Sequence, residues 1–140
     1  MLFRSAHLKD SEEFNHIRNA KEMARAAHVK ILQENKAPDE GASETFTLTD
    51  LYDDDRLEEM IDPSSGEDET PYDPSATQVT VENISPTGNK KAKFKYFVLL
   101  QSSGGYKYID ESDLSDPGKV DAKDLTRDHV EIPKRNAAGL

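Results

Sequence analysis

The stretch DSEEFNHIRNAKEMARAAHVKILQEN, residues 10–35, decides the fold of this chain. Its apolar side chains recur every three or four residues, which places them along one face of an α-helix. This spacing predicts a packing face made of Phe14, Ile17, Ala20, Ala24, Ala27 and Ile31. At about 1.5 Å per residue the helix is roughly 40 Å long, which is more than the remainder of a small chain can cover.

The residues ahead of this stretch, MLFRSAHLK, carry further apolar side chains, among them Leu2 and Phe3. Large apolar groups are costly to expose on a monomer. They fit either a frayed terminus or the middle of a longer helix whose first half lies upstream of Met1.

The composition fits one domain of 140 residues with one modest core. Hydrophobic residues make up 34% and charged residues 33%, so we expect long irregular stretches around that core. Cysteine is absent, which excludes disulfides and thiolate-bound zinc. No apolar run approaches the roughly 20 residues that cross a bilayer.

The net charge of −10 is concentrated in one segment. Residues 39–73 hold 14 acidic residues and the single basic residue Arg56, a local charge of −13 that leaves +3 on the rest. Binding to a phosphate backbone needs Lys and Arg to displace counterions. The acidic segment is therefore not expected to bind nucleic acid directly.

The acidic segment contains one short predicted helix, capped by Thr49 or Asp50 and ended by Pro63. Its expected apolar residues are Leu51, Leu57, Met60 and Ile61. The sequence SSGEDETPYDP that follows has the glycine, prolines and acidic residues of an ordered loop.

The hydrophobic period then changes to two, which is typical of strands. We expect an antiparallel meander with strands over residues 77–84, 92–101 and 105–110, joined by turns in SPTGNKK and SSGG. Both faces of the second strand are apolar, so it should be central. In the tail, only DHVEIP has strand character, and we expect it to form an edge strand.

These elements predict an α+β fold, with the long N-terminal amphipathic helix packed on a three- to four-stranded antiparallel sheet. We expect a single domain with four parts: a helix over 1–36, an acidic helix-to-sheet loop with a short helix over 37–76, the meander over 77–110 and a variable tail over 111–140.

No catalytic motif stands out. His16 and His28 are twelve residues apart, whereas two metal ligands on one helix are typically four apart. Ser102 and Ser103 lie in a glycine turn with no assignable histidine and acid partners. We therefore predict that the protein is not an enzyme.

Clustered carboxylates are the remaining candidates for a cofactor, because calcium takes oxygen ligands. One candidate set follows the third strand and comprises Asp110, Glu111, Asp113 and Asp116. The other comprises Asp62, Ser64, Glu67 and Asp68. Neither has the twelve-residue spacing of a hand-type calcium loop, so solvated acidic residues are the main expectation.

The order of elements, together with DPSSG at residues 62–66 and then Tyr72, resembles the globular part of type IV pilins and of the pseudopilins of type II secretion or competence systems. In those families the first half of the helix is an apolar membrane anchor, and the second half lies across the sheet. Residues 10–35 look like that second half. The DPSSG loop is similar to the Asp-Pro-Trp-Gly…Tyr loop of major pseudopilins but lacks its tryptophan, and the absence of cysteine looks more like pilins of Gram-positive bacteria.

The resemblance implies a structural subunit of a type IV pilus or pseudopilus that serves adhesion, motility, secretion or DNA uptake. It implies an extracellular, cell-surface location, and partners that are other copies of the chain and related pilins. A membrane would be contacted only through an upstream segment.

An alternative from another class is a soluble acidic protein-interaction module, including a mimic of nucleic acid. Closely spaced carboxylates imitate phosphates and speed encounter with a basic partner. Pro63, Gly66, Pro71 and Pro74 interrupt the acidic segment, whereas a mimic needs its charges on rigid elements.

Overall fold

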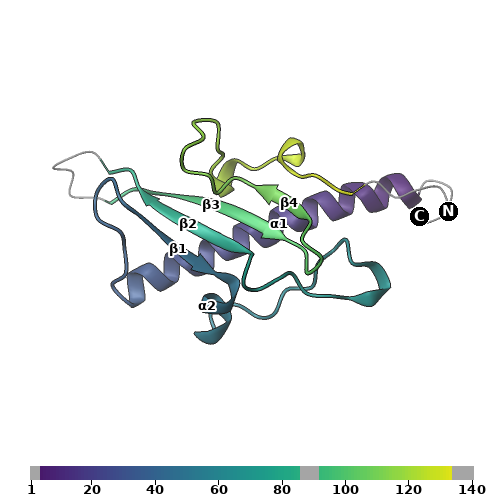
Figure 1. The fold of residues 1–140 in the computed structure, drawn as a ribbon, viewed down its shortest axis with the longest axis horizontal. Coiled ribbons are helices and arrows are strands. Elements are labelled where there is room, and N and C mark those ends of the chain that lie inside the picture. Colours follow the sequence, from purple (N-terminus) through teal and green to yellow (C-terminus); the bar gives the residue numbers. More distant parts are fainter. Residues whose placement is uncertain (1–3, 86–91, 134–140) are drawn as a thin grey trace.

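The long helix is α1 (Arg4–Gln33), which crosses one face of an antiparallel sheet (Figure 1). The computed structural model describes residues 4–85 and 92–133, with side chains from residue 11 onward. Leu2, Phe3 and residues 86–91 of the SPTGNKK turn lie outside the described residues. Asn35 ends α1 in the left-handed conformation at φ 55°, and the Lys36 amide donates to the Ile31 carbonyl at 3.0 Å. This is the hydrogen bond of a Schellman cap.

The sheet has four strands in the order β1-β2-β3-β4, so the α+β prediction is confirmed. The strands are β1 (Ser43–Thr47), β2 (Gln78–Asn83), β3 (Phe94–Gln101) and β4 (Lys107–Asp110). The last three form the predicted meander, and β3 is central as its two apolar faces predicted. Val98 and Leu100 join the core beneath α1, whereas Phe97 lies under Lys119, whose Nζ is 4.8 Å from the ring centre.

The fourth strand is not where the sequence placed it. The edge strand predicted in DHVEIP is wrong, because Arg127–His129 forms a 3₁₀ helix and the Glu131 amide donates a single backbone hydrogen bond to Tyr108. The added edge strand is β1, which pairs with β2 from Ser43↔Glu82 to Thr47↔Gln78. Phe46 is its only fully buried residue, so β1 carries almost no hydrophobic signal.

The short helix α2 (Leu48–Asp53) begins and ends earlier than predicted. Its cap is Thr47, whose hydroxyl accepts from the Asp50 amide while the Asp50 carboxylate accepts from the Thr47 amide. Asp50 is thus the third helical residue of a capping box and not the cap itself. Leu57, Met60 and Ile61 lie beyond α2, and Ile61 is 42% exposed.

The packing face of α1 differs from the predicted set at one end. Ile17, Ala20, Ala24, Ala27 and Ile31 are buried, but Phe14 is 57% exposed, so its placement in the core was wrong. The buried face is also wider than predicted, because the sheet and α2 cover α1 on one side and the tail covers it on the other. It also includes His16, Met23, Ala26 and Lys30.

Candidate functional site

A cluster of buried polar side chains joins α1 to the loop after α2 and to β4. His16 is fully buried at its centre, and Tyr72 beside it is 1% exposed. We call it the His16 cluster: Glu12, His16, Asn19, Asp62, Ser64, Tyr72 and Tyr108. Its members come from four separate parts of the chain, so the cluster forms only in the folded protein.

A single row of hydrogen bonds runs through this cluster. The Asn19 Nδ2 donates to the Tyr72 hydroxyl at 2.9 Å, and that hydroxyl lies 2.8 Å from His16 Nδ1. The opposite ring nitrogen, Nε2, lies 2.9 Å from Ser64 Oγ, which donates to Glu12 Oε2 at 3.2 Å. The Asn19 amide nitrogen can only donate to the Tyr72 hydroxyl, so this hydroxyl donates its own proton to His16 Nδ1. Ser64 donates its proton to the Glu12 carboxylate and therefore accepts from His16, so we assign the His16 proton to Nε2.

Asp62 is held beside this row. Its Oδ2 accepts from the Tyr108 hydroxyl at 2.5 Å, and its Oδ1 accepts from the Ser64 amide at 2.7 Å. The Tyr108 ring stacks on His16 with ring centres 4.0 Å apart. Asp62 Oδ1 is 3.9 Å from His16 Nε2, which is too long for a direct hydrogen bond.

Burial sets the protonation states of the cluster. It lowers the pKa of His16 to about 3, so the imidazole is neutral near pH 7. Burial also raises the pKa of Asp62 above its ordinary value, and it raises the pKa of both Tyr72 and Tyr108. Both tyrosines therefore keep their protons and remain hydrogen-bond donors.

The pair formed by Ser64 and His16 has the composition of a nucleophile and its base, but its hydrogen bonds run in the opposite direction. Nucleophilic catalysis needs the histidine to accept the serine proton while a third group accepts from the other ring nitrogen. Here Nε2 donates to Ser64, and Nδ1 accepts from Tyr72. This arrangement fastens the loop to the helix and does not activate a hydroxyl.

The other histidines are not brought to this cluster. His28 Nδ1 lies 2.5 Å from the Tyr96 hydroxyl on the exposed side of α1. His129 caps the last 3₁₀ helix by accepting from the Thr126 amide at 2.9 Å. The side chain of His7 lies outside the described residues.

Neither calcium candidate set is gathered into a site. Asp113 accepts from Ser115, Asp116 accepts from the Gly118 amide, and Asp110 lies 3.8 Å from Lys107. In the other set, Asp62 is taken up by the His16 cluster, whereas Glu67 and Asp68 are exposed. Across the described ranges, no three His, Asp or Glu side chains are placed to share a metal ion.

The acidic segment is divided between paired and exposed carboxylates. Asp54 contacts Lys30 and Arg56, and Lys30 is only 5% exposed. Arg56 and Lys30 also donate hydrogen bonds to Glu34 at the end of α1, and these bonds lower the pKa of Glu34 to about 2. By contrast, four carboxylates close to Asp54 in the sequence, Asp53, Asp55, Glu58 and Glu59, are exposed, as are others of this segment.

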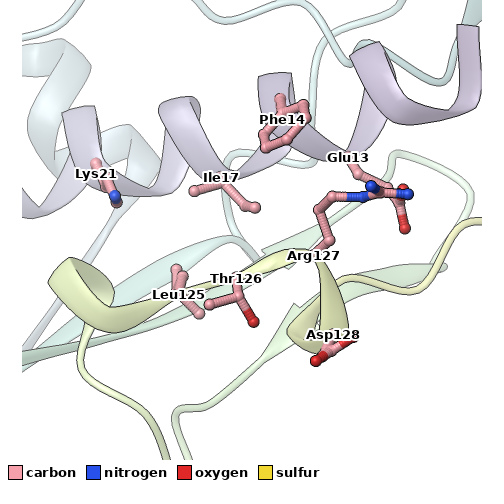
Figure 2. A pocket seen from close by; sticks show the side chains of 8 residues that line it. All are labelled: Glu13, Phe14, Ile17, Lys21, Leu125, Thr126, Arg127 and Asp128. Atoms are coloured by element: carbon pink, nitrogen blue, oxygen red, sulfur yellow. The ribbon is translucent and has the colours of Figure 1, made fainter. Parts of the chain in front are cut away.

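A groove separates α1 from the tail, and we call it the α1–tail groove. Its larger part, about 630 Å³, runs from Phe14 and Ile17 on the helix to Leu125 on the tail (Figure 2). A smaller part of about 400 Å³ has Phe94 and Tyr96 among its lining residues. Lys21 lines both parts, so they meet at this side chain.

Sequence reasoning missed the His16 cluster because it tested histidines only for metal-ligand spacing. A signal was nevertheless present. Glu12, His16 and Asn19 follow one another at intervals of four and three residues, so they form a polar stripe along one side of the helix. The stripe lies next to Ala20 at one border of the predicted packing face, but Asn19 was assigned to the opposite, polar face, so the burial of the stripe was not predicted.

Comparison with known proteins gives no family assignment. No protein-family model, no curated protein and no solved structure matches this chain. Among the helices described here, none offers a segment with the length and apolar character that spanning a membrane requires.

Proposed function

We propose that this chain is the globular domain of a subunit of a type IV pilus or pseudopilus, and that the full-length protein assembles into a cell-surface filament through its helix. The observation that carries the proposal is the attachment of the helix-to-sheet loop. Asp62 and Tyr72, the two ends of the pilin-like DPSSG…Tyr pattern, both lie in the His16 cluster against α1. The loop therefore supports the position of the helix on the sheet.

The shape of the molecule supports the same proposal. Figure 1 shows the N-terminal part of α1 continuing past the ends of the strands. A helix that extends beyond its own sheet has surface left for contacts with neighbouring subunits. In the proposed filament these neighbours are further copies of the chain and related pilins, and the membrane is contacted through an upstream segment.

Immunogold electron microscopy tests this function. Antibodies raised against the purified chain are applied to filaments sheared from the cells that encode it. We expect gold particles along the filaments, and the loss of this labelling in a strain that lacks the gene. Labelling confined to the cell interior would refute the proposal.

A further inference from the structure

We propose that the α1–tail groove of one copy receives the acidic residues 53–61 of a second copy, so that subunits associate head to tail. This inference rests on the proposed filament function and names the surfaces through which the globular domains meet.

The groove combines an apolar lining with basic residues along its edges. Phe14, Ile17 and Leu125 line one part, and Ala24 and Ala122 line the other. The charged lining residues are the basic Lys21, Arg25, Lys123 and Arg127 and the acidic Glu13, Asp121 and Asp128. Glu13 and Asp121 are buried, and Glu13 accepts a hydrogen bond from Arg127, so the exposed charges of the lining are mainly basic. A matching ligand should carry several negative charges and at least one apolar side chain.

The basic side chains of the groove remain accessible. Lys21, Arg25 and Lys123 are all exposed, and Arg25 pairs with the neighbouring Glu22 in a surface contact of 2.6 Å. Surface ion pairs of this kind contribute about 0–1 kcal/mol. They are therefore readily exchanged for contacts to another chain.

Residues 53–61, within the acidic segment of the same protein, have the complementary chemistry. Asp53, Asp55, Glu58 and Glu59 are exposed, and Ile61 at the end of this stretch is 42% exposed and supplies an apolar side chain. Asp54 is left out of the proposed contact because Lys30 and Arg56 already bind it.

The two surfaces lie at opposite edges of the molecule. The carboxylates of the proposed contact lie at and just after the end of α2, at the β1 edge of the sheet, and the groove lies beside the tail that follows β4, the strand at the other edge (Figure 1). A contact between two different patches is heterologous, and repeating it gives a ring or an open filament. An open filament is the assembly that the proposed function requires.

Complementary charge reversal tests this contact with the purified chain. One variant reverses the groove (Lys21→Glu with Lys123→Glu), and the other reverses the acidic segment (Asp55→Lys with Glu58→Lys). Sedimentation velocity of the wild type up to about 1 mM should show concentration-dependent association that about 0.5 M salt removes. Each variant alone should associate about tenfold more weakly, because two ion pairs are replaced by like-charge contacts.

An equimolar mixture of the two variants should recover association, since each reversed surface then meets a reversed partner and each native surface a native one. The matched control is Lys95→Glu with Lys107→Glu, which changes the charge equally at exposed positions outside the groove lining and should leave association unchanged. Absence of association in the wild type at about 1 mM, or failure of the mixture to recover it, would overturn the inference. Immunogold labelling of filaments would be unaffected by that result, so the two proposals fail separately.

Discussion

At the scale of single residues, His16 makes the stability of the protein depend on pH. Its pKa is about 3 in the folded chain and 6.5 in the unfolded one, so the unfolded chain binds a proton first as the pH falls. The stability attributable to neutral His16 is therefore complete above pH 6.5 and is lost progressively toward pH 3.

The variant His16→Gln keeps a side-chain donor but does not titrate, so it should remove this dependence. Between about pH 7.5 and about pH 4.5, the wild type should lose roughly 2–3 kcal/mol more unfolding free energy than the variant. Urea unfolding at both pH values measures the difference. Asp62, whose raised pKa gives the opposite slope at lower pH, is present in both proteins and largely cancels. The control is the exposed His28→Gln, which should keep the wild-type slope; equal slopes for all three proteins would contradict the prediction.

The row of hydrogen bonds in the His16 cluster depends on the hydroxyl group of Tyr72. Tyr72→Phe leaves the Asn19 amide and His16 Nδ1 without their partner while preserving the ring. Unsatisfied buried groups cost about 1–3 kcal/mol, and this is the expected loss of unfolding free energy in urea. Tyr106→Phe, at a half-buried ring that contacts Tyr108, should cost less than about 0.5 kcal/mol, and similar losses in the two variants would refute the special role of Tyr72.

At the scale of elements, strong periodicity was predictable and weak signals were not. The α1 and β3 patterns are long and apolar, so they were found with their correct partners. β1 has one fully buried residue in a run of polar ones, and the sheet recruits it through backbone pairing with β2. The Val130 side chain is buried without a strand, because the last 3₁₀ helix turns it inward.

Phe14 shows why periodicity alone does not define the end of a packing face. Helical spacing puts it on the same stripe as Ile17, but the residue that meets it is Arg127 of the tail, 5.7 Å from the ring centre. The position of the tail is set by contacts that no local pattern encodes. The same holds for the His16 cluster, whose members are separated by up to 96 residues, from Glu12 to Tyr108.

Truncations along α1 test the observed packing face. Ile31 is 1% exposed, so Ile31→Ala should lower the unfolding free energy by about 2–4 kcal/mol through lost burial and the cavity left behind. Phe14→Ala should cost about 1 kcal/mol or less because the ring is largely solvated. Arg18→Ala on the exposed face is the control and should be nearly neutral; equal unfolding midpoints for Ile31→Ala and Arg18→Ala would rule out this packing.

At the scale of the whole molecule, negative charge is concentrated in residues 39–73, and this concentration bears on the alternative function. An acidic module that mimics nucleic acid would use the exposed carboxylates of the acidic segment against a basic partner. The same carboxylates serve self-association in the head-to-tail inference. The two proposals differ in the binding partner of the acidic segment. For the mimic it is a different, basic protein, and for the head-to-tail contact it is the α1–tail groove of another copy.

The last prediction separates the carboxylates that maintain the fold from those that are free to bind. Neutralising Asp53, Asp55, Glu58 and Glu59 as amides changes the net charge from −10 to −6 and relieves self-repulsion. The melting temperature should stay the same or rise slightly, because these side chains are exposed. Adding Asp54→Asn removes the contact to the buried Lys30, whose pKa is raised because hydrogen bonds to Asp54 and Glu34 outweigh the effect of burial.

The fivefold variant should therefore lose about 1–3 kcal/mol relative to the fourfold one, measured by urea unfolding. Asp53→Asn alone is the control for the Asp54→Asn substitution, since it removes the same charge one residue away. If the fourfold variant had an unfolding free energy as low as that of the fivefold variant, the four exposed carboxylates would contribute to the stability of the fold and would not be free to bind a partner. If both were as stable as the wild type, the contact between Asp54 and Lys30 would contribute nothing to stability, and all five carboxylates would belong to one solvated surface.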